Sequence, residues 1–176
     1  FVRIADWIAG WERERRADVS KIFAEISGKL SIPLGKTEFV LRARADRIEQ
    51  RSDGTFAILD YKTGQPPTDK QVRTGLAPQL TLEAAILRKG GFPEIPAASS
   101  VSEIAYVRLK GGDPPGEPTS IKTEDGTPDS YADLALQKLT GIAQRFLVEG
   151  EPYRSLVHPM WKKQYGDYDH LARVKE

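Results

Sequence analysis

Residues 39–62 read FVLRARADRIEQRSDGTFAILDYK and decide the fold of this 176-residue chain. The pattern over 39–48 predicts one strand, and the Asp53-Gly54 pair supplies the positive φ angles that a tight hairpin needs. The nearly continuous apolar run over 55–62 predicts a buried central strand that turns polar only at its end. The hairpin therefore carries polar side chains to the rim of a sheet.

The segments around this hairpin are expected to complete one domain. Apolar spacing predicts helices over 1–16, 78–89 and 134–147 and further strands over 19–34 and 104–109. Four prolines in 111–130 indicate a long surface loop that holds neither a ladder nor a helix. The order of helix, three-stranded meander, helix, strand and helix predicts an α/β or α+β sandwich. Its last strand should lie parallel to its neighbour.

The composition limits the classes of function. With 26 Lys plus Arg against 25 Asp plus Glu, the net charge of +1 leaves only a local basic face for binding nucleic acid. The absence of cysteine excludes disulfides, a thiolate nucleophile and an iron–sulfur cluster held by this chain. The longest apolar runs fall far short of the roughly 20 residues of a membrane span. We expect a cytoplasmic protein with no membrane partner. Its start at Phe1, inside an apolar-periodic stretch, suggests a piece of a longer polypeptide.

The candidate catalytic residues lie at the end of the central strand. Asp60 and Lys62 share a face because side chains two apart in a strand point the same way. Across the short hairpin, Asp46 should lie close to Asp60, and two neighbouring carboxylates repel unless a cation lies between them. Mg²⁺ suits this place, since it takes oxygen ligands and leaves positions open for a substrate phosphate. A metal there would polarise a nonbridging oxygen of the phosphodiester and lower the pKa of a bound water. Lys62 would orient or deprotonate that water. The residues therefore indicate hydrolysis of a nucleic-acid backbone.

A weaker interpretation of the same residues stays open. An Asp-x-Lys sequence arises easily in a charge-rich chain, and an exposed pair is ordinarily a surface ion pair worth about 0–1 kcal/mol. The chain would then be a plain protein-interaction domain. The apolar strand before the pair, the Thr63-Gly64 break after it and the acid-bearing strand across the hairpin favour the catalytic interpretation.

Three stretches resemble the successive motifs of the PD-(D/E)XK nucleases of RecB type. They are 43–49 (ARADRIE), 58–64 (ILDYKTG) and 78–80 (PQL). The chain is most similar to the C-terminal nuclease domain of the AddB family, subunits of bacterial helicase–nucleases that process double-strand breaks, and 165–174 (YGDYDHLARV) shares this similarity. The resemblance implies a single RecB-like, restriction-endonuclease-like domain over 1–176, at the C-terminal end of a longer protein.

The same resemblance implies a function. It is that of a Mg²⁺-dependent deoxyribonuclease of exonuclease type, in which Mn²⁺ substitutes for Mg²⁺. Its partners would be DNA and an AddA-like helicase–nuclease subunit.

The resemblance also assigns roles to single residues. Asp46 and Asp60 match the metal ligands, and Lys62 matches the catalytic lysine. Gln79 matches the glutamine that opens the downstream helix motif and contacts the site or the DNA backbone. The tyrosine that often follows four residues later is Glu83 here, so this half of the motif departs from the family.

Other positions carry a second interpretation beside the functional one. Tyr61 lies inside the central motif and is a possible additional site residue. Glu25 either matches an acidic position of the relatives or is an exposed strand residue. Lys70 and Arg73 follow the site and either track DNA phosphates or are solvated loop charges.

Two features of the family are missing from this sequence. RecB-type domains carry a metal-binding His well upstream, whereas the histidines here are His158 and His170. We therefore expect that segment to lie outside the piece and the metal site to be incomplete. Many AddB proteins also hold an iron–sulfur cluster, whose stabilising role would pass to the tail aromatics Trp161, Tyr165 and Tyr168. The alternative function is thus a catalytically incomplete nuclease-fold module for DNA binding or subunit docking.

Overall fold

A mixed sheet of five strands forms the centre of the computed structural model, which describes residues 2–124 and 126–152. The strands follow one another across the sheet in chain order: β1 (Val19–Leu34), β2 (Thr37–Arg51), β3 (Phe56–Lys62), β4 (Val101–Leu109) and β5 (Gly116–Ser120). The helices are α1 (Val2–Arg15), α2 (Asp69–Thr74), α3 (Gln79–Arg88) and α4 (Pro128–Leu147), with a short 3-10 turn at Arg16–Asp18. This architecture confirms the predicted α/β domain with a three-stranded meander.

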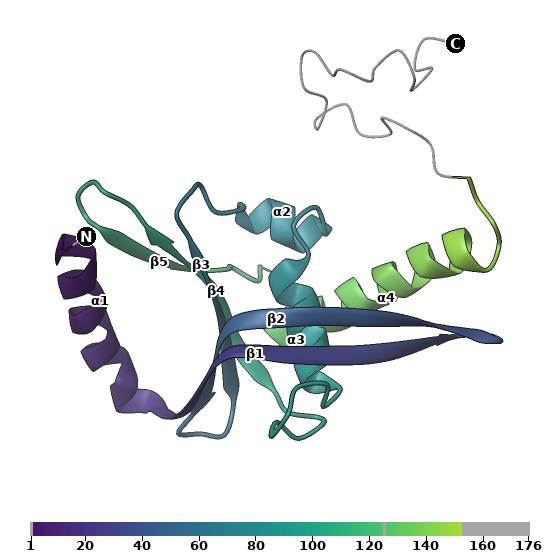
Figure 1. The fold of residues 1–176 in the computed structure, drawn as a ribbon, viewed down its shortest axis with the longest axis horizontal. Helices are drawn as coiled ribbons and strands as arrows, with labels where there is room; N and C mark the ends of the chain where they lie inside the picture. The colour runs from purple at the N-terminus through teal and green to yellow at the C-terminus, as the bar shows by residue number, and fades with distance from the viewer. Residues whose placement is uncertain (1, 125, 153–176) are drawn as a thin grey trace, which may run out of the picture.

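Helices cover both faces of the sheet (Figure 1). On one face, Trp7 and Trp11 of α1 pack against a cluster that contains Leu59. On the other face, Leu80 of α3 belongs to the main core cluster together with Ile58. Because successive residues of β3 point to opposite faces, Ile58 and Asp60 belong to the α3 face and Leu59 to the α1 face.

One pair of strands is parallel. β3 and β4 run in the same direction, while the other neighbouring pairs are antiparallel. The chain between β3 and β4 returns through α2 and α3, which is the crossover that a parallel pair requires. The expected parallel placement is confirmed. The carboxyl ends of both strands therefore meet at one edge, where open α/β sheets bind their ligands.

The long β1–β2 hairpin bends where it leaves the rest of the sheet (Figure 1). The buried positions of β1 change from odd numbers, as at Phe23, to even numbers, as at Gly28. In β2 the residues of the main core cluster likewise change from odd numbers, as at Ala45, to an even number at Ile48. The switch falls at Glu25, which has a φ of 52°. Asp46 lies opposite Glu25, because the flanking residue pairs of the two strands are in register. The bend therefore sets the position of Asp46.

A close backbone approach ties the hairpin to the loop after α3. A Cβ atom at Gly28 would lie 2.5 Å from the Phe92 ring, so only glycine allows this contact. The backbone N–H of Lys29 also donates to the carbonyl of Gly91 at 2.9 Å. These contacts hold the inner part of the hairpin against the core.

The loop predicted over 111–130 is wrong in two places. Gly116–Ser120 forms β5, with Pro118 opposite Val107 of β4. Proline is tolerated there because β5 is an edge strand, and an edge residue can lack the N–H that would point away from the ladder. In addition, α4 already begins at Pro128, after Thr127 closes a capping box with Ser130. The short helix α2, capped in the same way by Thr68, is a further element that the sequence reasoning missed.

The tail expectations fall outside the described residues. These are the core role of Trp161, Tyr165 and Tyr168, the motif at 165–174 and the histidines His158 and His170. In the part of the chain that the structure describes, none of the helices has the length and apolar character to cross a bilayer.

Candidate active site

A row of side chains crosses the α3 face at the carboxyl end of β3. Asp60 lies opposite Tyr106 of β4. The β2–β3 register pairs Arg47 with Leu59, and its continuation by one residue places Asp46 opposite Asp60. Lys62 follows two residues later on the same face. The hairpin therefore brings Asp46, Asp60 and Lys62 to one edge, as the sequence predicted.

Gln79, the first residue of α3, joins the two charged residues of β3. Its amide nitrogen donates to Asp60 Oδ1 at 2.6 Å, and its carbonyl oxygen accepts a hydrogen bond from Lys62 Nζ at 3.3 Å. Lys62 Nζ also lies 2.7 Å from Asp60 Oδ2. The three side chains form a closed set, so the predicted association of Gln79 with the site is observed.

Asp46 is held from the backbone of the neighbouring strand. Its Oδ2 accepts the N–H of Tyr61 at 3.0 Å, and its side chain is half-buried. The Tyr61 side chain points to the α1 face, where its hydroxyl accepts from Arg47 at 3.3 Å and burial raises its pKa. Tyr61 therefore contributes a backbone donor to the site rather than its ring.

Glu83 is a site residue that the sequence analysis named only as a departure from the family motif. It lies one turn after Gln79 in α3, is only 2% exposed, and accepts from the Gln79 amide at 3.2 Å. The pKa of Glu83 is raised to about 7, mainly by burial. The hydrogen bond from Gln79 opposes this rise, and the negative charges of Asp60 and Asp46 add to it. Helical spacing from Gln79 was the signal that could have placed this acid at the site.

The comparison with protein families agrees with this geometry. A family model described as the PD-(D/E)XK nuclease superfamily matches residues 2–155. The chain belongs to this superfamily. The restriction-endonuclease-like description of the fold, with its mixed sheet and flanking helices, is thereby confirmed.

Curated relatives of this PD-(D/E)XK domain are uncharacterized proteins of Rickettsia. One from Rickettsia bellii is 30% identical over 173 residues, which cover 92% of this chain and 20% of that protein. One from Rickettsia conorii is 26% identical over 181 residues, which cover 91% of this chain and 21% of that protein. The chain thus spans about one fifth of the length of these relatives.

The oxygen atoms of this PD-(D/E)XK site fit a hard divalent cation, which nucleases of the superfamily generally use. Asp60 Oδ2 and Glu83 Oε2 are both buried; Glu83 Oε2 accepts no hydrogen bond, and among the described residues Lys62 alone forms an ion pair with Asp60, through Oδ2. Within 2–124 and 126–152 there is no group of three or more His, Asp or Glu side chains arranged to hold a metal. Mg²⁺ is ordinarily bound by one or two carboxylates, with waters and phosphates at its other positions. Asp46 and Asp60 meet this requirement.

The remaining predicted residues lie away from this set. Glu25 is exposed and pairs with Arg44 at 2.8 Å. Arg73 donates to the carbonyl of Lys122 and pairs with Glu124 at 3.0 Å, so its charge is already compensated. Lys70 is exposed on α2, and its side chain forms no ion pair with any other described residue.

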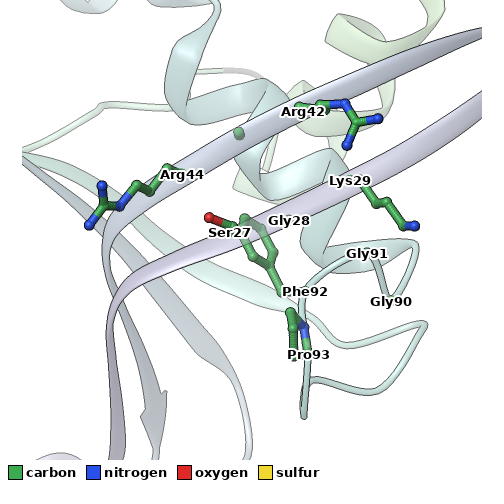
Figure 2. Close-up of a pocket in the computed structure, with 10 residues that line it drawn as sticks. Ser27, Gly28, Lys29, Arg42, Arg44, Gly90, Gly91, Phe92 and Pro93 are labelled. Atoms are coloured by element: carbon green, nitrogen blue, oxygen red, sulfur yellow. The ribbon is translucent and has the colours of Figure 1, made fainter.

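A local basic face lies on the hairpin. A hollow of about 650 Å³ is bordered by Lys29, Arg42 and Arg44, and Figure 2 shows the Phe92 ring beside Gly28, both of which also line it. Arg44 is paired with Glu25, whereas Lys29 and Arg42 have no ion pair within the described chain. A local basic face, which the balanced net charge left open, is thus present on the hairpin, with two of its three cations unpaired within the described chain.

The opposite face of the sheet holds a buried ionic network beneath α1. Fully buried Glu49 accepts from Arg15 at 2.8 Å and from Arg47 Nε at 2.8 Å. Arg47 also pairs with Glu12 of α1 and donates to the Tyr61 hydroxyl. The network therefore fixes β2 and β3 immediately behind Asp46 and Asp60.

Proposed function

We propose that this PD-(D/E)XK domain is a metal-dependent deoxyribonuclease of exonuclease type. The observation that carries the proposal is the closed set of Asp60, Lys62 and Gln79 beside Asp46 and the buried Glu83, whose Oε2 accepts no hydrogen bond. Asp46 and Asp60 would hold Mg²⁺, and Mn²⁺ would replace it. A bound ion of this kind supplies Lewis acidity and a water of lowered pKa.

Lys62 and Gln79 would position the charged groups around the reacting phosphodiester. In hydrolysis, a water oxygen bonds to phosphorus, the bond from phosphorus to the leaving sugar oxygen breaks, and that oxygen takes up a proton. The Lys62 ammonium, 2.7 Å from Asp60 Oδ2, places a positive charge where the transferring phosphoryl oxygens gain negative charge. Gln79 binds both partners and so fixes their relative orientation.

The larger assembly is part of the same proposal. The motif resemblance at 43–49, 58–64 and 78–80 supports an AddB-type subunit that acts in double-strand break repair in the cytoplasm. Relatives about five times as long as the chain leave room for the remainder of such a subunit. An AddA-like helicase subunit would deliver single strands to the site.

A second candidate is a nuclease-fold module that docks DNA or a subunit without cleaving. It is favoured by one observation: the Lys62 ammonium already neutralises Asp60, and no three-ligand acid or His group exists among the described residues. In that case metal binding would be weak, and no phosphodiester would be cut.

Digestion of single-stranded DNA tests the two candidates. The chain, and a version extended to the length of its relatives, would be incubated with Mg²⁺ or Mn²⁺ beside Lys62→Ala and, as a control, Lys36→Ala in the exposed turn of the hairpin. The nuclease proposal expects cleavage by the wild type and Lys36→Ala and none by Lys62→Ala. Inert wild-type protein in both lengths, with no heat of Mg²⁺ binding, would establish the docking module instead.

A further inference from the structure

A second cavity opens beside the candidate site, at the carboxyl ends of the parallel strands. It has a volume of about 330 Å³ and lies between the 65–69 loop and the strands β4 and β5. Tyr106 and Arg108 line it from β4, and Glu117 and Thr119 line it from β5. At about 30 Å³ for each water, it holds roughly ten waters, which is enough for a phosphate group and part of a sugar.

Strand register joins this cavity to the site. Lys62 pairs with Arg108 and Asp60 pairs with Tyr106 in the parallel ladder, so the four side chains form two adjacent rows on the α3 face. Neighbouring strands lie about 4.8 Å apart. The Lys62 ammonium also lies 5.9 Å from the centre of the Tyr106 ring. The cavity therefore lies one strand away from Asp60 and Lys62, on the same face of the sheet.

Arg108 combines a place in the lining of this cavity with a guanidinium that has no partner among the described residues. Its Nε is buried without a hydrogen bond, and no ion pair or hydrogen bond between described residues uses its guanidinium. Arg47, by contrast, is held by Glu12 and Glu49. Glu117, the acid across from Arg108 in the ladder, pairs with Lys110 at 3.3 Å.

A buried donor without an acceptor is costly, and an anion that enters the cavity would remove that cost. The planar guanidinium fork matches phosphate oxygens in a bidentate manner, which a lysine does not do. Thr119 supplies a hydroxyl in the same lining. The lining also contains the carboxylates of Asp69 and Glu117, and Glu117 is paired with Lys110. A phosphate group would therefore contact the Arg108 and Thr119 side of the cavity.

We propose that Arg108 binds a backbone phosphate of the substrate strand, next to the phosphodiester that Asp60 and Lys62 receive. This subsite rests on the proposed nuclease function and adds a substrate-binding residue to it. It holds the strand in register with the site, so its loss should weaken binding much more than turnover.

Binding and kinetics of Arg108→Gln test the proposal. The probe is a fluorescent single-stranded oligothymidylate, titrated by anisotropy in EDTA at several salt concentrations. Each phosphate contact to a single strand contributes about 0.7 to the slope of log K against log salt. We expect Arg108→Gln to lower this slope by about that amount and to raise KM roughly tenfold, with kcat changed less than about threefold. Arg108→Lys should recover the slope but only part of the affinity.

Arg13→Gln provides the matched control, because Arg13 is exposed on α1, which covers the other face of the sheet. Thermal melting of both variants verifies that they fold. If Arg108→Gln behaves like Arg13→Gln while the wild type binds and cuts DNA, the subsite is refuted and the nuclease function stands. If neither the wild type nor Lys62→Ala binds the oligonucleotide, both the subsite and the proposal that DNA is the substrate are refuted.

Discussion

The Gln79 amide nitrogen lies 2.6 Å from Asp60 Oδ1, although the two residues belong to different elements separated by the 63–78 connection. This contact sets the rotation of the Asp60 carboxylate. Because Gln79 also accepts from Lys62, it keeps the carboxylate and the ammonium at a fixed separation. The start of α3 thus orients two charges that β3 alone would only place on the same face.

Replacement of Gln79 should lower turnover without unfolding the domain. Gln79→Leu removes a hydrogen bond to a charged group, worth about 1.5–3 kcal/mol, which corresponds to a loss in kcat of roughly 10- to 100-fold. Initial rates of single-strand digestion measure the effect. Gln137→Leu, at an exposed position of α4, serves as the control, and equal rates for the two variants would contradict a positioning role.

Glu83 should make the stability of the metal-free protein depend on pH. Its pKa is raised from 4.5 to about 7, so the native state retains a proton that the unfolded chain releases. The resulting stabilisation is present below about pH 4.5 and is lost as the pH rises through about 7. From pH 5 to pH 8, the wild type should lose up to about 3 kcal/mol relative to Glu83→Gln.

Urea unfolding in EDTA at both pH values measures this difference for Glu83→Gln. Glu38→Gln, an exposed substitution on β2, should follow the wild type. Parallel pH profiles for the wild type and Glu83→Gln would show that the Glu83 carboxyl titrates normally.

Removal of Glu49 should destabilise the domain strongly. Glu49→Ala leaves the Arg15 and Arg47 guanidiniums beside it without this buried carboxylate, and breaking a buried pair in this way costs about 3–5 kcal/mol. Chemical unfolding measures the cost, with Glu38→Ala as the exposed comparison. A loss below about 1 kcal/mol would mean that water or neighbouring acids replace Glu49 without penalty.

Glu25 should matter through its backbone and not through its carboxylate. Glycine adopts its φ of 52° without strain, and the exposed pair with Arg44 contributes about 0–1 kcal/mol at most. We expect Glu25→Gly to keep nuclease activity within about twofold and stability within about 1 kcal/mol. An activity loss comparable to that of Asp46→Asn would instead support the functional interpretation of Glu25.

Local rules account for the features that the sequence predicted. The period of two in a strand put Asp60 and Lys62 on one face, and the short turn at Asp53-Gly54 carried Asp46 across to them. Gln79 followed from its place in a motif. The placement of the three charged residues thus depends on residues close in sequence or joined by one hairpin, whereas Gln79 depended on the family resemblance.

Features that depend on distant packing were not predicted. The contact of Glu49 with Arg15 links β2 to α1. The two residues are far apart in sequence, so no helical or strand periodicity predicts the contact. The face switch at Glu25 lies in a backbone angle that a Glu residue rarely adopts. The strand β5 was missed because the rule against proline in ladders applies to central strands and not to an edge, where Pro118 lies.

Pro118 has a further effect on how the molecule meets its own copies. An outermost strand presents open amide and carbonyl groups, on which a second chain can add a strand of its own. A proline interrupts that row of donors. The β5 side of the sheet is thus protected against intermolecular strand addition and the aggregation that follows from it.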